Sequence, residues 1–214
     1  MHRFATVLGV VATLVTLACG GVVLASGAPR RATEPAPTPP AWQVVTGPAG
    51  TFEVPPEAAG WRVRDPDQVV YYADRHGDPL VGIAGPAVLD DGYCASATGA
   101  SNRGFAGLTG PRRGTAWQVS RRESRRWRTA VAGRATPPGR TTPLTLEDGS
   151  VAVRSHAVVR PLVAGPCQAE RVALDHVSVA GSAGVVTLVV VRDLVAGAAP
   201  IADIERLLRT LRVR

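Results

Sequence analysis

Residues 185–192 read VVTLVVVR, and this short stretch decides the fold. Almost every side chain in it is apolar, which is typical of a central strand that other parts of the chain cover on both faces. Two segments with helical periodicity, at residues 116–132 and 201–211, can supply that cover, and shorter strand-like runs surround them. The pattern therefore predicts an α+β fold in which a mainly antiparallel sheet is covered by two helices.

Residues 116–132 predict an amphipathic helix with defined ends. Thr115 and Gln118 have the spacing of a capping box, and Gly133 suits the C-terminal end. On a wheel of about 100° per residue, one half is mainly apolar and the other half is basic. The apolar half holds Ala116, Trp117, Val119, Trp127, Ala130 and Val131, with Glu123 at its edge. The basic half holds Arg121, Arg122, Arg125, Arg126 and Arg128.

The second helix is expected to begin after Pro200. Its predicted buried side chains are Ile201, Ile204, Leu207, Leu208 and Leu211. Strands are expected at residues 42–45, 51–54, 60–64, 68–73, 80–84, 144–147, 151–159, 169–179 and 185–192. Two pairs of these strands form hairpins, one through a turn at residues 74–79 and one through Asp148 and Gly149.

The N-terminal part of the chain is apolar, and no charged residue occurs between Phe4 and Pro29. About twenty apolar residues span a bilayer, so residues 1–28 predict one N-terminal transmembrane helix that anchors the protein. A cleaved signal peptide, cut after Ser26 or Gly27, and a lipoprotein acylated at Cys19 are the two alternatives. Residues 29–41 predict a proline-rich linker, and residues 42–214 predict one α+β domain.

Cys94 and Cys167 are the only cysteines after the apolar segment. An even pair in a proline- and glycine-rich domain predicts a single disulfide, which forms outside the cytoplasm. The alternative is two separate buried thiols, since the sequence does not show that the residues meet. The positive charges on the two sides of the apolar segment, Arg3 with the amino terminus and Arg30 with Arg31, are nearly balanced and give no clear orientation. The expected localisation therefore depends on the disulfide: the cell membrane, in a single pass, with the C-terminal domain outside the cytoplasm.

A loop of small residues runs from Gly92 to Gly104. Long loops without secondary structure are often functional, so a binding loop is one interpretation. Because Cys94 lies in this loop, we favour the other interpretation, in which the disulfide simply pins the loop to the following sheet.

All 24 basic residues are arginines, and the formal net charge is +7. This charge is spread along the chain, and three of the four tryptophans belong to amphipathic or strand patterns that predict burial. A nucleic-acid-binding protein needs basic residues and aromatic rings together on one surface. The sequence therefore does not favour nucleic acid as a partner.

One set of acids and a histidine has the residue types that bind metal ions. Its members are Asp74, His76, Asp78, Asp90 and Asp91. A calcium loop of the EF-hand type needs acids at alternate positions, a central glycine and a distal glutamate. A proline and an apolar stretch interrupt this set, so we interpret its members as solvated turn residues and expect no metal and no cofactor.

Two pairs of neighbours, Ser155 with His156 and Asp175 with His176, contain the residue types of a hydrolase triad. Neighbours on a strand point to opposite faces of the sheet, so neither pair can act together locally. The chain has no Gly-x-Ser-x-Gly elbow, no His-Glu-x-x-His motif and no phosphate-binding glycine loop. The sequence therefore predicts no catalytic residue, and we expect His176 to be a core side chain.

The basic face of the first helix is the strongest candidate site. Arginines at helical spacing repel one another, at a cost of about 0.2–0.5 kcal/mol per pair. A surface that tolerates this repulsion favours contact with anionic lipid headgroups, a phosphate-bearing wall polymer or an acidic envelope protein. The alternative is an ordinary solvated face in an arginine-rich protein.

Three pieces of the chain resemble known sequences. Residues 51–63, TFEVPPEAAGWRV, resemble the opening of PsbP-like domains. Residues 69–94, VVYYADRHGDPLVGIAGPAVLDDGYC, and residues 102–110, NRGFAGLTG, resemble an uncharacterised actinobacterial family of membrane-anchored extracytoplasmic domains. The resemblance implies a PsbP-like α/β/α sandwich outside the membrane, and it carries no catalytic residue. The basic helix departs from what that fold implies.

Together these patterns predict a membrane-anchored, extracytoplasmic, non-catalytic domain for interaction or sensing at the cell envelope. One alternative is a carrier that holds an apolar, lipid-like envelope molecule between sheet and helix, and an apolar cavity with convergent polar groups would favour it. The other alternative is a hydrolase, which a cluster of serine, histidine and acid within hydrogen-bond reach would favour.

Overall fold

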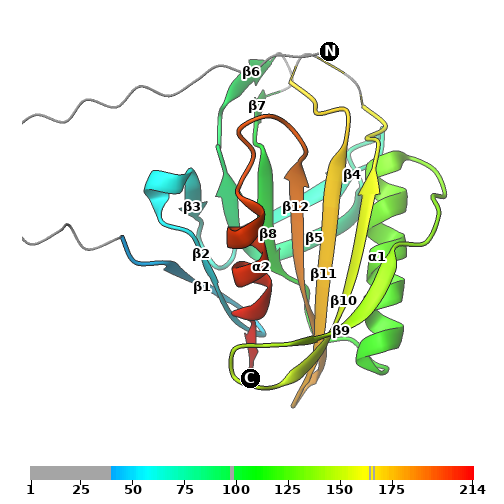
Figure 1. Ribbon diagram of the computed structural model, residues 1–214. Coiled ribbons are helices and arrows are strands. Elements are labelled where there is room, and N and C mark those ends of the chain that lie inside the picture. Colours follow the sequence, from blue (N-terminus) through cyan, green and yellow to red (C-terminus); the bar gives the residue numbers. More distant parts are fainter. Residues whose placement is uncertain (1–39, 97–98, 164, 166) are drawn as a thin grey trace, which may run out of the picture. The chain divides into compact units, whose positions relative to one another are not determined.

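The computed structural model describes residues 40–96, 99–163, 165 and 167–214, and it places the VVTLVVVR stretch in strand β12 (Gly184–Asp193). This strand lies in the interior of an eight-stranded sheet, as its apolar composition predicts (Figure 1). Every strand pair of the sheet is antiparallel. The strand order is β3 (Trp61–Val63), β5 (Pro79–Leu89), β8 (Gly104–Leu108), β12, β11 (Val172–Gly181), β10 (Val151–Val159) and β9 (Arg140–Thr145), and β4 (Val69–Ala73) pairs with β5.

The remaining elements surround this sheet. A three-stranded sheet consists of β1 (Gln43–Gly47), β2 (Gly50–Val54) and β13 (Arg212–Val213), and a short hairpin consists of β6 (Cys94–Ser96) and β7 (Gly99–Ser101). The helices are α1 (Ala116–Ala132), α2 (Ile201–Arg209) and the 3₁₀ turn η1 (Glu57–Ala59). The α+β class, the mainly antiparallel sheet and the two helices are therefore confirmed.

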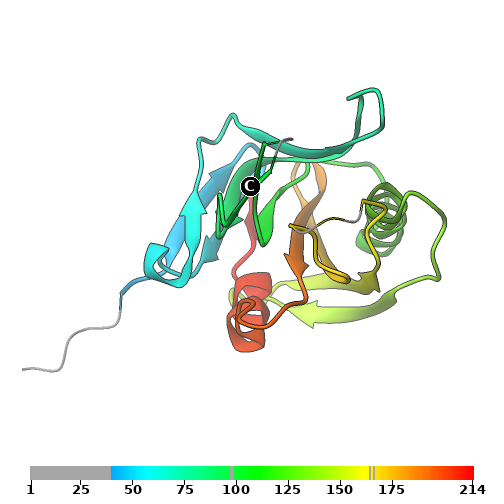
Figure 2. The ribbon, with the colours of Figure 1, turned by 90° about the horizontal axis from the view of Figure 1, so that it is seen from above.

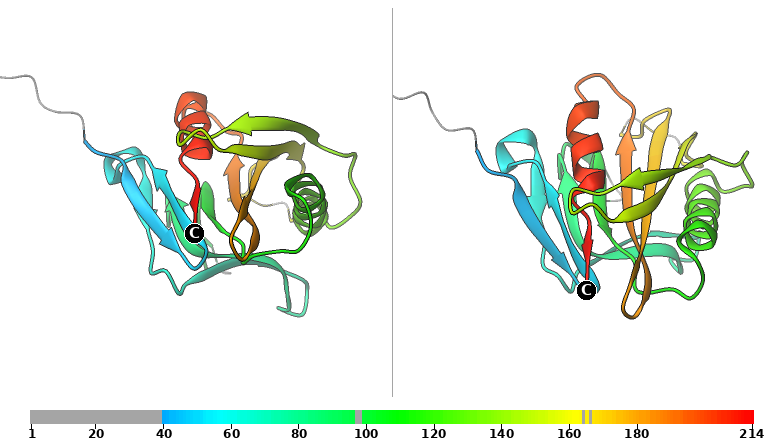
Figure 3. Two further views of the ribbon diagram at one scale, coloured as in Figure 1. Left: turned by 90° about the horizontal axis from the view of Figure 1, so that it is seen from below. Right: turned by 60° about the horizontal axis from the view of Figure 1, so that its bottom comes forward.

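The large sheet curves, and its two faces have different covers. Figure 2 shows the sheet bending around α1, which contacts β4, β5, β9, β10, β11 and β12. Helix α2 and the small sheet lie over the other face, as both views of Figure 3 also show. Because side chains alternate along a strand, each central strand contributes to two separate apolar clusters.

The cluster beneath α2 is the larger one. It joins Val177 and Leu188 of the central strands to Phe52 of β2 and to Ile204 and Leu207 of α2, all of them buried. The cluster beneath α1 joins Leu174 and Val189 of the same strands to Phe105 and Trp127. Two apolar layers on one sheet explain why the VVTLVVVR stretch has almost no polar side chain.

Strand β8 was not predicted, because its sequence, GFAGL, has two glycines and no β-branched residue. The glycines permit close packing: a Cβ at Gly104 would lie 2.5 Å from the Val191 carbonyl oxygen, and one at Gly107 would lie 2.5 Å from Ile83 Cδ1. Small residues are therefore needed between β5 and β12, although they weaken the strand pattern.

Other expectations also need correction. Strand β5 extends to Leu89, well beyond the predicted residue 84, and α2 ends at Arg209 rather than at residue 211. Trp117 and Ile201 were expected to be buried, but both are exposed, because they lie on the first turns of their helices.

The transmembrane helix expected within residues 1–28 falls outside the described residues. In the part of the chain that the structure describes, no helix has the length and apolar character needed to cross a membrane.

Candidate functional site

Helix α1 has the predicted bounds because its ends are fixed by local interactions. The Thr115 amide donates to Gln118 Oε1 at 3.0 Å, and the Gln118 amide donates to Thr115 Oγ1 at 3.3 Å. Gly133 ends the helix with a φ of 64°, a conformation that glycine adopts without strain. This capping box and C-terminal glycine set which arginines face the solvent.

The five arginines of the basic half do not form one uniform face. Arg122 donates to the Arg113 carbonyl at 3.3 Å, and Arg126 lies 3.3 Å from the carboxylate of Glu123. Arg128 is only 5 % exposed, which corrects the wheel assignment. Three of these arginines, Arg121, Arg122 and Arg125, are exposed and form no ion pair with any carboxylate of the described residues. Of the three, Arg122 donates to a backbone carbonyl outside the helix, whereas Arg121 and Arg125 line a common cleft.

Arg128 is buried because it holds the segment that follows α1. Its Nε donates to the Ser124 carbonyl at 3.2 Å, and its Nη1 donates to the carbonyl of Thr136 at 2.7 Å and to that of Pro137. Burial, and next the charge of Arg125, lower the pKa of Arg128. The wheel cannot predict this position, because the segment that covers Arg128 follows the helix rather than belonging to it.

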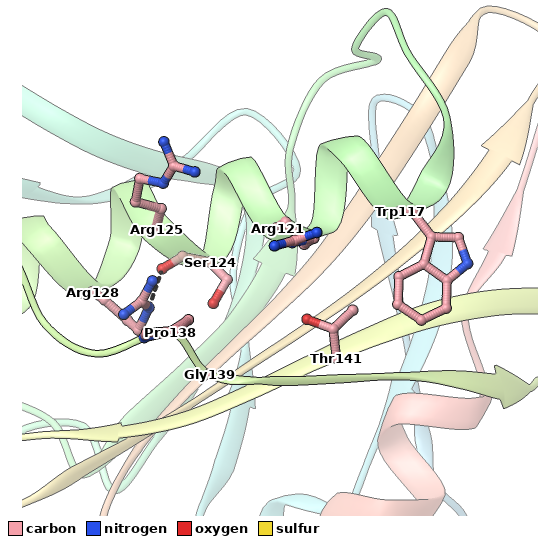
Figure 4. A pocket seen from close by; sticks show the side chains of 8 residues that line it. All are labelled: Trp117, Arg121, Ser124, Arg125, Arg128, Pro138, Gly139 and Thr141. Carbon is pink, nitrogen blue, oxygen red and sulfur yellow. Dashed lines mark hydrogen bonds between the residues drawn. The ribbon is translucent and has the colours of Figure 1, made fainter.

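The segment held by Arg128 forms one wall of a cleft, and α1 forms the other wall. The cleft has a volume of about 320 Å³. Its lining residues are Trp117, Arg121, Ser124, Arg125, Arg128, Pro138, Gly139 and Thr141. Figure 4 shows these side chains along α1 and the facing strand, with Trp117 at one end and Arg128 at the other. We refer to this feature as the arginine cleft.

Gly139 allows the wall of the arginine cleft to lie close to the sheet. A Cβ at this position would lie 2.4 Å from the His156 carbonyl oxygen, which is backbone and cannot move aside cheaply. Any larger residue would therefore push this wall away from β10 and change the shape of the cleft.

Hydroxyl groups connect the cleft with the core beneath α1. Thr141 Oγ1, which lines the cleft, lies 2.9 Å from Ser155 Oγ, and Ser155 Oγ lies 2.8 Å from Ser120 Oγ. Ser155 and Ser120 are buried, so this chain of hydroxyls holds Thr141 in place from behind. The arginine cleft thus combines two uncompensated guanidinium groups, hydroxyls and an aromatic ring, which is a suitable set for binding an anion.

His176 lies in the core beneath α1, as expected, with its ring 6.2 Å from that of Trp127. Both of its ring nitrogens are buried and have no hydrogen-bond partner in the described structure. Burial lowers the pKa of His176 to about 4, although the Asp175 charge acts in the opposite direction. His176 is therefore neutral at physiological pH, and it is not among the residues that line the arginine cleft.

On the opposite face, beneath α2, the sheet carries a charged network that the sequence analysis missed. Arg154 donates to Asp175 Oδ1 at 2.9 Å and to both carboxylate oxygens of Glu205 at 2.8 and 2.9 Å. His156 Nδ1 lies 3.0 Å from Asp175 Oδ1. Burial raises the pKa of Asp175, but His156 and Arg154 outweigh it and hold that pKa below its usual range.

This network requires the register of two strands, His156 opposite Asp175, which the sequence does not supply. A histidine oriented by an aspartate is also part of hydrolase triads. Among the described residues, however, no hydroxyl or thiol donates to the other ring nitrogen of His156. We therefore interpret the network as structural.

The cysteines and the acids singled out in the sequence hold a loop or shape turns. Cys94 and Cys167 form the expected disulfide, with a Cα–Cα distance of 5.7 Å, and the loop it holds contains the β6–β7 hairpin. Asp74 accepts from the amides of His76 and Asp78 at 2.8 and 3.1 Å and so shapes a turn. Asp91 forms an ion pair with Arg64, and Asp90 has a positive φ of 48°. Within the described residues, no group of three acids, histidines or cysteines could hold a metal ion.

Comparison with known proteins gives a family and no activity. The model of the family Domain of unknown function (DUF8017) matches residues 35–214, which is most of the chain. No curated protein and no solved structure matches the chain.

Proposed function

The chain belongs to the family Domain of unknown function (DUF8017), and from its structure we propose that it is a non-catalytic interaction domain that binds phosphate groups of the cell envelope in the arginine cleft. In this proposal residues 1–28 anchor the protein in the cell membrane in a single pass, and residues 42–214 lie outside the cytoplasm.

The observation that carries the proposal is the pair Arg121 and Arg125. Both line the cleft, and neither is compensated by a carboxylate of the described residues, whereas Arg126 and the buried Glu123 form an ion pair. Adjacent uncompensated arginines destabilise a helix slightly, and a bound phosphate group would reduce that repulsion. A guanidinium group can bind phosphate through two parallel hydrogen bonds, which adds geometric specificity to the attraction between the charges.

The shape of the cleft favours a small anionic group over the flat acidic surface of a protein. Its volume of about 320 Å³ is at the low end for a small-molecule site. Thr141 can donate to a phosphate oxygen, and Trp117, which is 45 % exposed, offers an apolar ring beside it. A lipid headgroup and a phosphate-bearing wall polymer share this chemistry.

Two observations support the proposed location of residues 42–214, outside the cytoplasm and at a membrane surface. The disulfide between Cys94 and Cys167 is typical of oxidising compartments. The apolar N-terminal run and the proline-rich linker are suited to holding a domain at a membrane surface.

Binding can be measured with the full chain in phosphatidylcholine nanodiscs, titrated with inorganic phosphate while tryptophan emission is recorded. The W117F variant identifies the part of the signal that comes from the cleft. The double variant R121Q/R125Q is expected to lose at least a factor of ten in phosphate affinity, since a hydrogen bond to a charged group contributes about 1.5 kcal/mol.

The matched control is R122Q/R134Q, which removes the same charge from exposed positions outside the cleft. We expect this variant to bind phosphate like the wild type. Equal losses in both double variants would mean that only the overall charge matters, and the proposal would fail.

The same measurement distinguishes the two sources of phosphate. Nanodiscs that contain phosphatidylglycerol lower the apparent affinity for free phosphate if a lipid headgroup occupies the cleft. If the affinity is unchanged and a glycerol phosphate polymer competes instead, the wall polymer is the ligand.

A further inference from the structure

A second hollow lies at the C-terminal end of α1, and the residues that line it are different from those of the arginine cleft. It has a volume of about 330 Å³ and lies between β4, the ends of β8, β11 and β12, and the segment that begins at Pro161. Its lining combines apolar side chains, among them Val131, Val172 and Val191, with a similar share of polar groups. We refer to it as the apolar pocket.

Packed aromatic rings form part of the inner wall of this pocket. The Tyr72 ring lies 6.1 Å from that of Trp127, edge-on, and 6.0 Å from that of Phe105. The Phe105 and Trp127 rings are themselves 6.0 Å apart. Three aromatic rings in mutual contact, two of them lining the pocket, form a preformed surface for an apolar ligand.

Two polar groups converge on this apolar surface. Asp193 lines the pocket with a side chain that is 15 % exposed, and its carboxylate lies 3.6 Å from the Arg103 guanidinium. Tyr72 also lines the pocket, and burial together with the Asp193 charge raises the pKa of its hydroxyl, which therefore keeps its proton. The Asp193–Arg103 pair is neutral as a whole, so it favours an uncharged ligand group that can donate and accept hydrogen bonds.

The polar end of the pocket is connected with the disulfide. The Arg103 guanidinium lies 3.8 Å from the centre of the Tyr93 ring, and the Tyr93 hydroxyl donates to the Cys167 carbonyl. Cys167 lines the pocket and is bonded to Cys94. The disulfide thus holds the wall that positions Arg103 and, through it, Asp193.

The rim of the pocket is apolar and exposed. Leu162 and Val163, which line the pocket, are 68 % and 65 % exposed. Exposed apolar residues around a hollow mark a place where an apolar molecule can enter from its surroundings.

We propose that the apolar pocket binds a small amphiphile, with its hydrocarbon chain against the aromatic wall and an uncharged hydroxyl head at Asp193, whose carboxylate Arg103 pairs from outside the pocket lining. This site is independent of the arginine cleft, and it gives the protein a second ligand of a different chemical class. A carboxylate head would be repelled by Asp193, and an ammonium head would compete with Arg103.

The test uses 6,6,6-trifluorohexan-1-ol as the probe, observed by fluorine NMR with the full chain held in amphipol. We expect saturable binding to the wild type that is at least tenfold weaker in A130F, because Ala130 lines the pocket and a phenyl ring there fills it. The control A202F places the same ring on an exposed position of α2 and should bind like the wild type. Equal binding by A130F and the wild type would overturn the proposal, and so would an absence of saturable binding.

The head group is tested separately. The D193L variant should bind the alcohol at least fivefold more weakly, and D193N, which keeps a carbonyl acceptor, should recover most of the affinity. The corresponding trifluorinated carboxylic acid should bind the wild type at least fivefold more weakly than the alcohol. If the acid binds as tightly as the alcohol, the assignment of Asp193 is wrong. R121Q/R125Q should leave alcohol binding unchanged, so failure of the phosphate proposal and failure of this one give different results.

Discussion

The two faces of the large sheet differ in how they bury polar groups. Beneath α2, the strands carry a charged network, with Arg154 between Asp175 and Glu205, although Asp175 Oδ2 has no partner among the described residues. Beneath α1, the same strands bury uncharged groups, and both ring nitrogens of His176 are without a partner among the described residues. Both hollows with an assigned ligand chemistry also border α1.

This difference indicates that the face beneath α2 mainly stabilises the fold, whereas the face beneath α1 borders both proposed binding sites. The apolar cluster beneath α2, which contains Leu188 and Leu207, is the larger of the two, and buried apolar area stabilises the fold. The face beneath α2 therefore contributes most to folding. The face beneath α1 accepts polar groups, a glycine-supported wall and incomplete packing, which are features that proteins tolerate where they bind ligands.

The largest effect is expected from breaking the charged network beneath α2. The R154M variant leaves the buried Asp175 carboxylate without its guanidinium partner, and we expect the free energy of unfolding to fall by about 4 kcal/mol. Urea denaturation followed by circular dichroism measures this loss. The control R160M, at an exposed position, should change stability by less than about 0.5 kcal/mol.

A second substitution tests the cause of that loss. Adding D175N to R154M removes the buried charge, which in R154M has only His156 beside it, so part of the lost stability should return. If R154M costs less than about 1 kcal/mol, the network is too weakly buried to matter, and the two faces are more alike than their contacts indicate.

Beneath α1, the pH dependence of stability is the sharper measurement. The folded state keeps His176 neutral down to its pKa of about 4, whereas the unfolded chain takes up a proton near pH 6.5. The His176 contribution to stability is therefore complete above pH 6.5 and is lost as the pH falls towards 4. By pH 4 the expected loss is roughly 3 kcal/mol.

The difference between wild type and H176L isolates this effect. Burial raises the pKa of Asp193 to about 6, so Asp193 alone makes the folded state more stable as the pH falls from 6 to 3.8 and partly hides the histidine. The H176L variant should gain roughly 3 kcal/mol relative to wild type between pH 7 and pH 4. Asp175, beneath α2, has a lowered pKa, so its contribution is lost only below pH 3.8. A constant difference across this range would show that His176 is charged or solvated in the folded state.

Local sequence signals predicted the parts of the fold that depend on neighbouring residues. The capping box at Thr115 and the glycine at residue 133 gave the bounds of α1, and the apolar run at residues 185–192 gave the interior strand. Strand β8 was missed because its glycines serve close packing against Val191 and Ile83, which are distant in sequence.

The candidate site could be predicted only in part, for the same reason. Helical periodicity identified the arginines but placed Arg128 on the solvent side, because the covering segment at Thr136 and Pro137 lies outside the helix. Pairing of His156 with Asp175 requires the strand register. The apolar pocket combines β4, β8, β12 and the end of α1, so no single stretch of sequence contains its pattern.

The smallest effect concerns the hydroxyl chain that joins the core beneath α1 to the arginine cleft. T141V removes one hydrogen bond to Ser155, and S120A removes the other, so each should lower the free energy of unfolding by about 1 kcal/mol. Only Thr141 lines the cleft, so T141V should also weaken phosphate binding about fivefold, whereas S120A should not. Phosphate titrations of both variants, beside their urea curves, separate the two roles. Equal phosphate affinity in T141V and S120A would mean that the hydroxyls beneath α1 only support the fold, and the face would then bind anions through its arginines alone.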